Sequence, residues 1–200
     1  MKKLIVSALC FLFIAPALGD VQTFENDFDG FMQEAGPLSI IDFETLPDGQ
    51  PSMGGEELTD DFNYDAQGVH FSAPFPYPFI AGNPVTGFEL AVSASQDTWI
   101  IAELIAPAYA VGGFFAGATE LCAFDQLGSE IACVSFNQSG EGNFVGIVAT
   151  DPIYSAVFSE GAHSERIESF IFSPVPEPAT LALLASAAAL MVGRRRRAAI

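Results

Sequence analysis

Short apolar runs rich in Ile, Val and Phe recur along the chain after Pro37, separated by Gly, Pro, Asn and Asp. Runs of this length and composition predict strands. The predicted strands are Leu38–Glu44, Gly68–Ser72, Gly87–Ser93, Trp99–Leu104, Ala110–Ala116, Glu120–Phe124, Glu130–Phe136, Asn143–Ala149, Ile153–Phe158 and Arg166–Phe172. No helical pattern long enough for a parallel crossover lies between them. We therefore expect an all-β fold, an antiparallel β-sandwich or jelly roll over residues 37–173.

The segment before this domain, residues 20–36, has a different period. Its apolar residues recur at helical spacing, at Phe24, Phe28, Phe31, Met32 and Ala35. This pattern predicts a short amphipathic helix with Thr23 as its N-cap and Gly36-Pro37 as its end. Residues 25–30 also resemble the start of an EF-hand calcium loop, but the twelfth position of that loop is a glycine instead of a bidentate glutamate. The helix is the favoured interpretation.

A proline-rich stretch, residues 73–79, interrupts the strand pattern. Its alternating prolines cannot serve a central strand, because proline removes a ladder hydrogen bond. We expect an extended loop that exposes aromatic rings, with Tyr77 as a candidate glycan contact. The single tryptophan, Trp99, is a second candidate as a sugar-stacking platform, although a place in the core is the favoured alternative.

Residues 1–19 have the features of a secretory signal peptide. Lys2 and Lys3 precede an apolar run, and small residues stand before Asp20. We predict cleavage after Gly19. An uncleaved membrane anchor is the alternative, but the apolar run is short for a span.

The C-terminal residues 174–200 carry a second apolar run and a basic end. Residues 179–193 are 15 in number, about 22 Å of helix against a hydrocarbon core of about 30 Å. Arginines can reach back to the interface, so this run is predicted to be a transmembrane helix. The arginine block favours a cytoplasmic C-terminus, which places the preceding domain outside the inner membrane.

The charge of the chain is concentrated in its middle. Between Lys3 and Arg194 there is one basic residue, Arg166, against 25 acidic residues, a net charge of −24. A surface of this kind repels phosphate backbones, which excludes nucleic acid as a partner. It also repels itself, so salt or divalent cations are expected to stabilise the fold.

The C-terminal segment resembles the PEP-CTERM sorting signal. The features that carry the resemblance are a Pro-Glu-Pro motif, a short apolar span and a basic end, at Pro176, Glu177, Pro178, Arg194, Arg195, Arg196 and Arg197. The resemblance implies recognition by an exosortase, a membrane cysteine peptidase of Gram-negative bacteria that make exopolysaccharide. It also implies export through the inner membrane, insertion by the C-terminal helix before processing, and a final place at the cell surface or in the extracellular matrix.

The middle of the chain resembles lectin-like jelly-roll domains of exported proteins of this type. The resemblance is carried by the stretches 41–49, 67–72, 111–115, 123–128 and 144–147. It implies a structural calcium ion held by acids of the first and last strands, for which Asp42, Glu44 and Glu168 are the candidates. The last predicted strand, Arg166–Phe172, contains one acidic residue where the pattern of these domains has two.

Cys122 and Cys133 flank a predicted turn at residues 125–128. The exported compartment permits a disulfide between them, and the register of the hairpin decides whether it forms. A two-residue loop at Leu127-Gly128 would place the cysteines opposite each other. A three-residue loop closing on Gly128 would send them to opposite faces of the sheet. The sequence does not decide between a disulfide and two buried thiols.

No nucleophile-elbow, zinc-protease or paired-cysteine motif occurs in the sequence. The two histidines, His70 and His163, are interpreted as structural or surface residues. We therefore expect a non-catalytic exported surface protein that binds a glycan, with exopolysaccharide as a candidate partner and no cofactor beyond structural calcium. The alternatives are a secreted polysaccharide-active hydrolase and a calcium-stabilised matrix protein.

Overall fold

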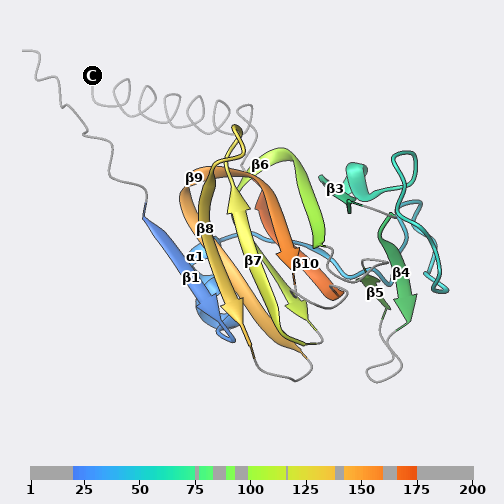
Figure 1. The fold of residues 1–200 in the computed structure, drawn as a ribbon, viewed down its shortest axis with the longest axis horizontal. Coiled ribbons are helices and arrows are strands. Elements are labelled where there is room, and N and C mark those ends of the chain that lie inside the picture. The colour runs from blue at the N-terminus through green and yellow to red at the C-terminus, as the bar shows by residue number, and fades with distance from the viewer. Residues whose placement is uncertain are drawn as a thin grey trace, which may run out of the picture.

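The computed structural model describes residues 20–74, 77–82, 89–92, 99–115, 117–137, 142–159 and 166–174. In these ranges the chain forms ten strands, the short helix α1 and one 3-10 helix (Figure 1). The predicted signal peptide, His163 and the sorting motif after Pro174 lie outside these ranges. No helix among the described residues is long and apolar enough to cross a membrane.

All strand pairs are antiparallel, and the strand order is β4-β5-β10-β6-β9-β7-β8, with β1 on β9, β2 on β10 and β3 on β6. The elements are β1 Val21–Glu25, α1 Phe28–Ala35, β2 Ser39–Ile41, η1 Tyr64–Gln67, β3 Val69–Ser72, β4 Phe79–Gly82, β5 Glu89–Val92, β6 Trp99–Phe115, β7 Thr119–Phe124, β8 Glu130–Phe136, β9 Asn143–Ser159 and β10 Arg166–Pro174. The predicted antiparallel all-β fold is thus confirmed.

Two long strands, β6 and β9, join the two halves of the fold. Each has 17 residues and merges two of the predicted strands. The first half of β6 pairs with β3 and with the end of β9, whereas its second half pairs with β10 and with the start of β9. The register shifts on both sides of the Ala108–Ile153 pair, next to Pro107 and Pro152. Because proline gives no ladder hydrogen bond, the strands bend there and pass from one half to the other (Figure 1).

The main core lies between these two halves, and aromatic rings within its aliphatic side chains make contacts between the halves. Phe170 of β10 packs against Phe71 of β3, with ring centroids 5.5 Å apart, and against Phe158 of β9, at 5.7 Å. Both contacts are edge-to-face, which is the favoured arrangement of aromatic quadrupoles. All three rings are buried, so they hold the halves together.

The N-terminal segment differs from its prediction. Residues 21–25 form β1, which pairs with Val145–Ala149 of β9, and the helix begins only at Phe28. Asp27 is the N-cap in place of Thr23, and its Oδ1 accepts a hydrogen bond from the Gly30 backbone N–H at 2.9 Å. The available edge of β9 outweighs the helical spacing, because a strand there gains a full ladder of hydrogen bonds. This segment therefore belongs to the same sheet as the rest of the domain.

A second, smaller core lies where α1 covers the outer face of the sheet. It consists of Phe24, Phe31, Ala110, Phe144 and Ile171. The helix approaches closely because the strand residue beneath Phe31 is Gly146, which pairs with Gly112 of β6. A Cβ on Gly146 would lie 2.6 Å from Cδ2 of Phe31 and 2.8 Å from Cζ of Phe144. Only glycine leaves room for both rings.

We expect the Gly146→Ala variant to lower the free energy of unfolding by about 1–3 kcal/mol, because the added methyl group overpacks the helix contact. Denaturant unfolding of the variant measures this change. The matched control is the same substitution in a Phe31→Leu background, where the ring edge is gone. There the substitution should cost less, and a cost that is the same in both backgrounds would refute the contact with Phe31 as a cause of the destabilisation.

Candidate functional site

The hairpin between β7 and β8 turns through a three-residue loop. The Asp125 backbone N–H donates to the Ser129 carbonyl at 2.9 Å, and the Gly128 N–H donates to the Asp125 carbonyl at 3.1 Å. Oδ1 of Asp125 also accepts hydrogen bonds from the N–H groups of Leu127 and Ser129, both at 2.8 Å. Gly128 has a φ of 76°, the left-handed conformation that the residue before the returning strand requires. The loop is therefore the second of the two predicted types.

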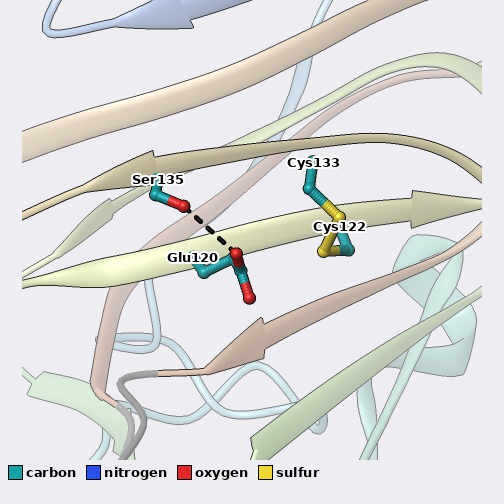
Figure 2. The surroundings of a disulfide bond; sticks show 4 residues. All are labelled: Glu120, Cys122, Cys133 and Ser135. Atoms are coloured by element: carbon teal, nitrogen blue, oxygen red, sulfur yellow. Dashed lines mark hydrogen bonds between the residues drawn. A yellow bond between two sulfur atoms is a disulfide. The ribbon is translucent and has the colours of Figure 1, made fainter.

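Cys122 and Cys133 nevertheless lie opposite each other and form a disulfide, with their Cα atoms 4.1 Å apart (Figure 2). Phe124 pairs with Glu130, but the register then shifts, so that Ala123 pairs with Ala132. The prediction that a three-residue loop separates the cysteines is therefore wrong, because one extra residue bulges from β8 and moves the register by one. Ser135 donates to Glu120 at 3.1 Å across the same pair of strands.

A pocket of about 550 Å³ lies beside this hairpin. It forms where the loop, the bend of β9 and the start of β1 meet. Its lining residues are Val21, Asp125, Gln126, Glu130, Ile131, Asp151, Pro152 and Tyr154. Its volume lies within the range of small-molecule sites.

The bend of β9 positions one wall of this pocket. Phe124 of β7 pairs with Ser155, which places the hairpin loop next to Tyr154. On the other side of the bend, the Thr150 N–H donates to the Asp20 carbonyl at 3.2 Å, which holds the start of β1 in place. Asp151 is exposed, whereas Tyr154 is half-buried. The pocket is thus framed by hydrogen-bonded backbone on each side.

The lining combines apolar and polar groups. Val21, Ile131 and Pro152 supply an apolar surface, and the Tyr154 ring adds an aromatic one. Three carboxylates accept hydrogen bonds, and the Gln126 amide both donates and accepts them. Such a lining suits a ligand with hydroxyl or ammonium groups and a less polar face. It disfavours anionic ligands, because three acids line the same space.

The predicted glycan contacts lie elsewhere. Trp99 begins β6 and its side chain is 41% exposed, so the alternative of a core position is wrong. Tyr77 is 47% exposed, as the proline-rich loop predicts. Neither residue lines the pocket. Tyr154 was not predicted as a site residue. The sequence signal that could have indicated it is the Asp-Pro pair at 151–152, which bends a strand just before an aromatic residue.

The candidate calcium ligands are not gathered into a compact group. Oδ1 of Asp42 accepts a hydrogen bond from the Glu44 N–H at 3.1 Å, and Glu168 lies on β10. In the part of the chain that the structure describes, the one group of three candidate metal-ligating side chains with ligand atoms within 4.8 Å is Cys122, Glu130 and Cys133. Its two sulfur atoms form the disulfide, so they offer no thiolate to a metal.

Other ionisable side chains serve local structure. Nδ1 of His70 lies 2.9 Å from Oδ1 of Asp65, in agreement with a structural or surface role. The carboxylate of Glu56 accepts hydrogen bonds from the Met53 N–H at 2.9 Å and from the Ser52 hydroxyl at 3.0 Å. The first of these bonds is the main reason that the pKa of Glu56 is lowered. Both groups fix loops outside the pocket.

Comparison of the sequence with known families identifies residues 174–197 as a PEP-CTERM protein-sorting motif. This motif indicates export and exosortase-mediated sorting to the cell surface. The match begins at Pro174, the last residue of β10, so the domain and the sorting motif adjoin in sequence. No curated protein matches the chain in sequence.

Among solved structures, similarity is found to a mutant of a family 29 carbohydrate-binding module, with 8% identity, 73% of this chain and 95% of that chain covered, and a TM-score of 0.40. A Streptococcus pneumoniae fucose-binding module has 15% identity over 46% and 74% of the two chains, with a TM-score of 0.33. The lectin-binding domain of lectinolysin has 12% identity over 43% and 72%, with a TM-score of 0.34. Because these TM-scores are low, the similarity decides neither the ligand nor the chemistry of this chain.

We expect replacement of both cysteines by alanine to lower the free energy of unfolding by about 2–3 kcal/mol, because the disulfide closes a loop of sequence separation 11. Denaturant titration of the variant and of the oxidised native protein measures the difference. The native protein under reducing conditions is the control and should resemble the variant. Coinciding midpoints for oxidised and reduced native protein would contradict the prediction.

Proposed function

We propose that the β-sandwich of this exported protein binds a neutral or amino-containing polysaccharide in the pocket between the β7–β8 loop and the bend of β9, without cleaving it. The observation that carries the proposal is the lining of this pocket, in which carboxylates, an amide and a tyrosine surround an apolar surface. Sugar rings likewise combine polar and apolar parts, with hydroxyl groups at the rim and C–H groups on the face. The PEP-CTERM motif supports the proposal, because it indicates sorting to the cell surface, where the domain can meet polysaccharides.

The rigidity of the pocket supports this function. Asp125 fixes its own loop through two hydrogen bonds, and the disulfide ties the strands that carry the loop. A wall that is ordered before the ligand arrives reduces the entropy that binding costs. Pocket residues on a clamped hairpin are therefore suited to recognition.

The charge of the pocket selects the class of polymer. Asp125, Glu130 and Asp151 present carboxylates to the same space, in a chain whose middle carries a net charge of −24. Polymers with uronic acids or sulfates are repelled, whereas neutral hydroxyl groups and protonated amines are not. We infer that the ligand is a neutral or amino-containing polysaccharide.

A hydrolase is the second candidate, because the pocket holds more than one carboxylate and glycoside hydrolysis needs a pair. Glu130 and Asp151 are both exposed. A general acid of such enzymes lies in an apolar environment, which neither residue has. We therefore favour binding over turnover, and the binding experiment includes an assay for cleavage.

We expect the Tyr154→Ala and Asp151→Asn variants to bind the exopolysaccharide of the producing bacterium about tenfold more weakly than the native protein does, because each variant loses roughly one good contact. Titration calorimetry measures the affinity, with and without calcium. The matched controls are Trp99→Ala and Tyr77→Ala, which remove exposed rings outside the pocket. Loss of binding in these controls, with none in Tyr154→Ala, would refute the pocket. New reducing ends in the mixture would show cleavage and favour the hydrolase.

For sorting, we expect the protein recovered from the cell surface to lack Arg194–Arg197, because processing removes the segment that follows the Pro-Glu-Pro motif. Mass spectrometry of the mature C-terminus measures this. The Glu177→Ala variant should remain in the membrane fraction with its arginines. Recovery of native protein at the surface with an intact C-terminus would contradict exosortase processing.

A further inference from the structure

The sorting motif leaves the domain at the bends of β6 and β9. Pro174, the last residue of β10, pairs with Ala108 of β6, and Ala108 pairs in turn with Ile153 of β9. These three residues form one row across neighbouring strands, which lie about 4.8 Å apart. We call the surface around this row the tail-exit end and define it by the exposed apolar side chains described next.

Three large apolar side chains are exposed at the tail-exit end: Ile105, Tyr109 and Leu127, which are 60%, 40% and 89% exposed. Ile105 and Tyr109 stand on either side of Pro107 in the bend of β6. Leu127 is in the loop of the β7–β8 hairpin, which projects past the bend of β9 because Phe124 pairs with Ser155. Figure 1 shows the bend of β6 and this hairpin at the same end of the molecule.

The tether between this surface and the predicted transmembrane run is short. The run starts at Ala179, five residues after Pro174. Five residues span at most about 18 Å even when fully extended. A domain attached in this way cannot move far from a bilayer that the run crosses, and the side nearest the bilayer is the one from which the chain leaves.

We propose that the tail-exit end rests on the outer surface of the inner membrane until processing, with Ile105, Tyr109 and Leu127 in the interfacial region of the bilayer. The proposal depends on the predicted membrane span of residues 179–193. Tyrosine favours this region because its ring is apolar and its hydroxyl is polar, and isoleucine and leucine gain from leaving water.

The contact is apolar and not electrostatic. Among the described residues the one lysine or arginine is Arg166, which begins β10, whereas the chain leaves at the other end of that strand. Asp125 and Asp151 lie near the tail-exit end and would repel anionic headgroups. A zwitterionic lipid surface therefore fits this end better than an anionic one.

The test uses the full-length protein, processed at its N-terminus, in vesicles of phosphatidylcholine with brominated acyl chains, which quench tryptophan at shallow depth. The chain has a single tryptophan, Trp99, which lies six residues before Ile105 on β6, about 20 Å away. It is the internal control and should not be quenched. The probes are Tyr109→Trp and Leu127→Trp, each in a Trp99→Phe background.

We expect at least twofold lower emission from each probe in brominated vesicles than in unbrominated ones. Emission that is unchanged in both probes would overturn the proposal, as would equal quenching of Trp99. Protection of the C-terminal arginines from added trypsin confirms that the tail has inserted, and cleavage of all of them would overturn the premise. The competing possibility is that a second copy of this chain covers the tail-exit end. Sedimentation of the protein in detergent measures its oligomeric state, and a dimer that buries Tyr109 would also overturn the proposal. None of these outcomes depends on glycan binding.

Discussion

Two strands that bend at the same place hold the whole structure together. β6 and β9 pair along nearly their full length, and Ala108 and Ile153 face each other where both change direction. In a straight pair the rings of the two halves would lie too far apart to bury one another. Because both strands bend, Phe71 and Phe158 of one half reach Phe170 of the other. The same bend creates the wall of the pocket and the end from which the sorting motif leaves.

Much of the fold could be predicted from the sequence, because alternation and turn residues are local signals. Glu130–Phe136 was predicted with its observed bounds, and most other strands within a few residues. What failed depended on partners distant in sequence. Residues 21–25 have a helical spacing and became a strand because β9 offered them an edge. The merging of predicted strands into β6 and β9 depends on how prolines bend a paired strand, which a single segment does not reveal.

The candidate site was less accessible to sequence reasoning. Its walls come from three segments that touch only after the sandwich forms, and its aromatic residue, Tyr154, stands in an ordinary strand pattern. Trp99 was considered as a glycan contact because it is the single tryptophan, but it does not line the pocket. The disulfide required a bulge in β8 that shifts the pairing by one residue, and neither of the simple loop types includes it. Counting residues back from a turn predicts the cross-strand partners only where neither strand contains a bulge.

The place where the sorting motif joins the sheet has a mechanical consequence. β10 lies between β5 and β6 in the strand order, so the chain is attached through a central strand and not through an edge. A pull on Pro174 along the axis of β10 loads its ladder to β6 in shear, and many hydrogen bonds must break together. An edge strand pulled sideways would instead open one bond at a time. A pull transmitted through the sorting motif therefore meets many hydrogen bonds at once, and the sheet resists unfolding from this end.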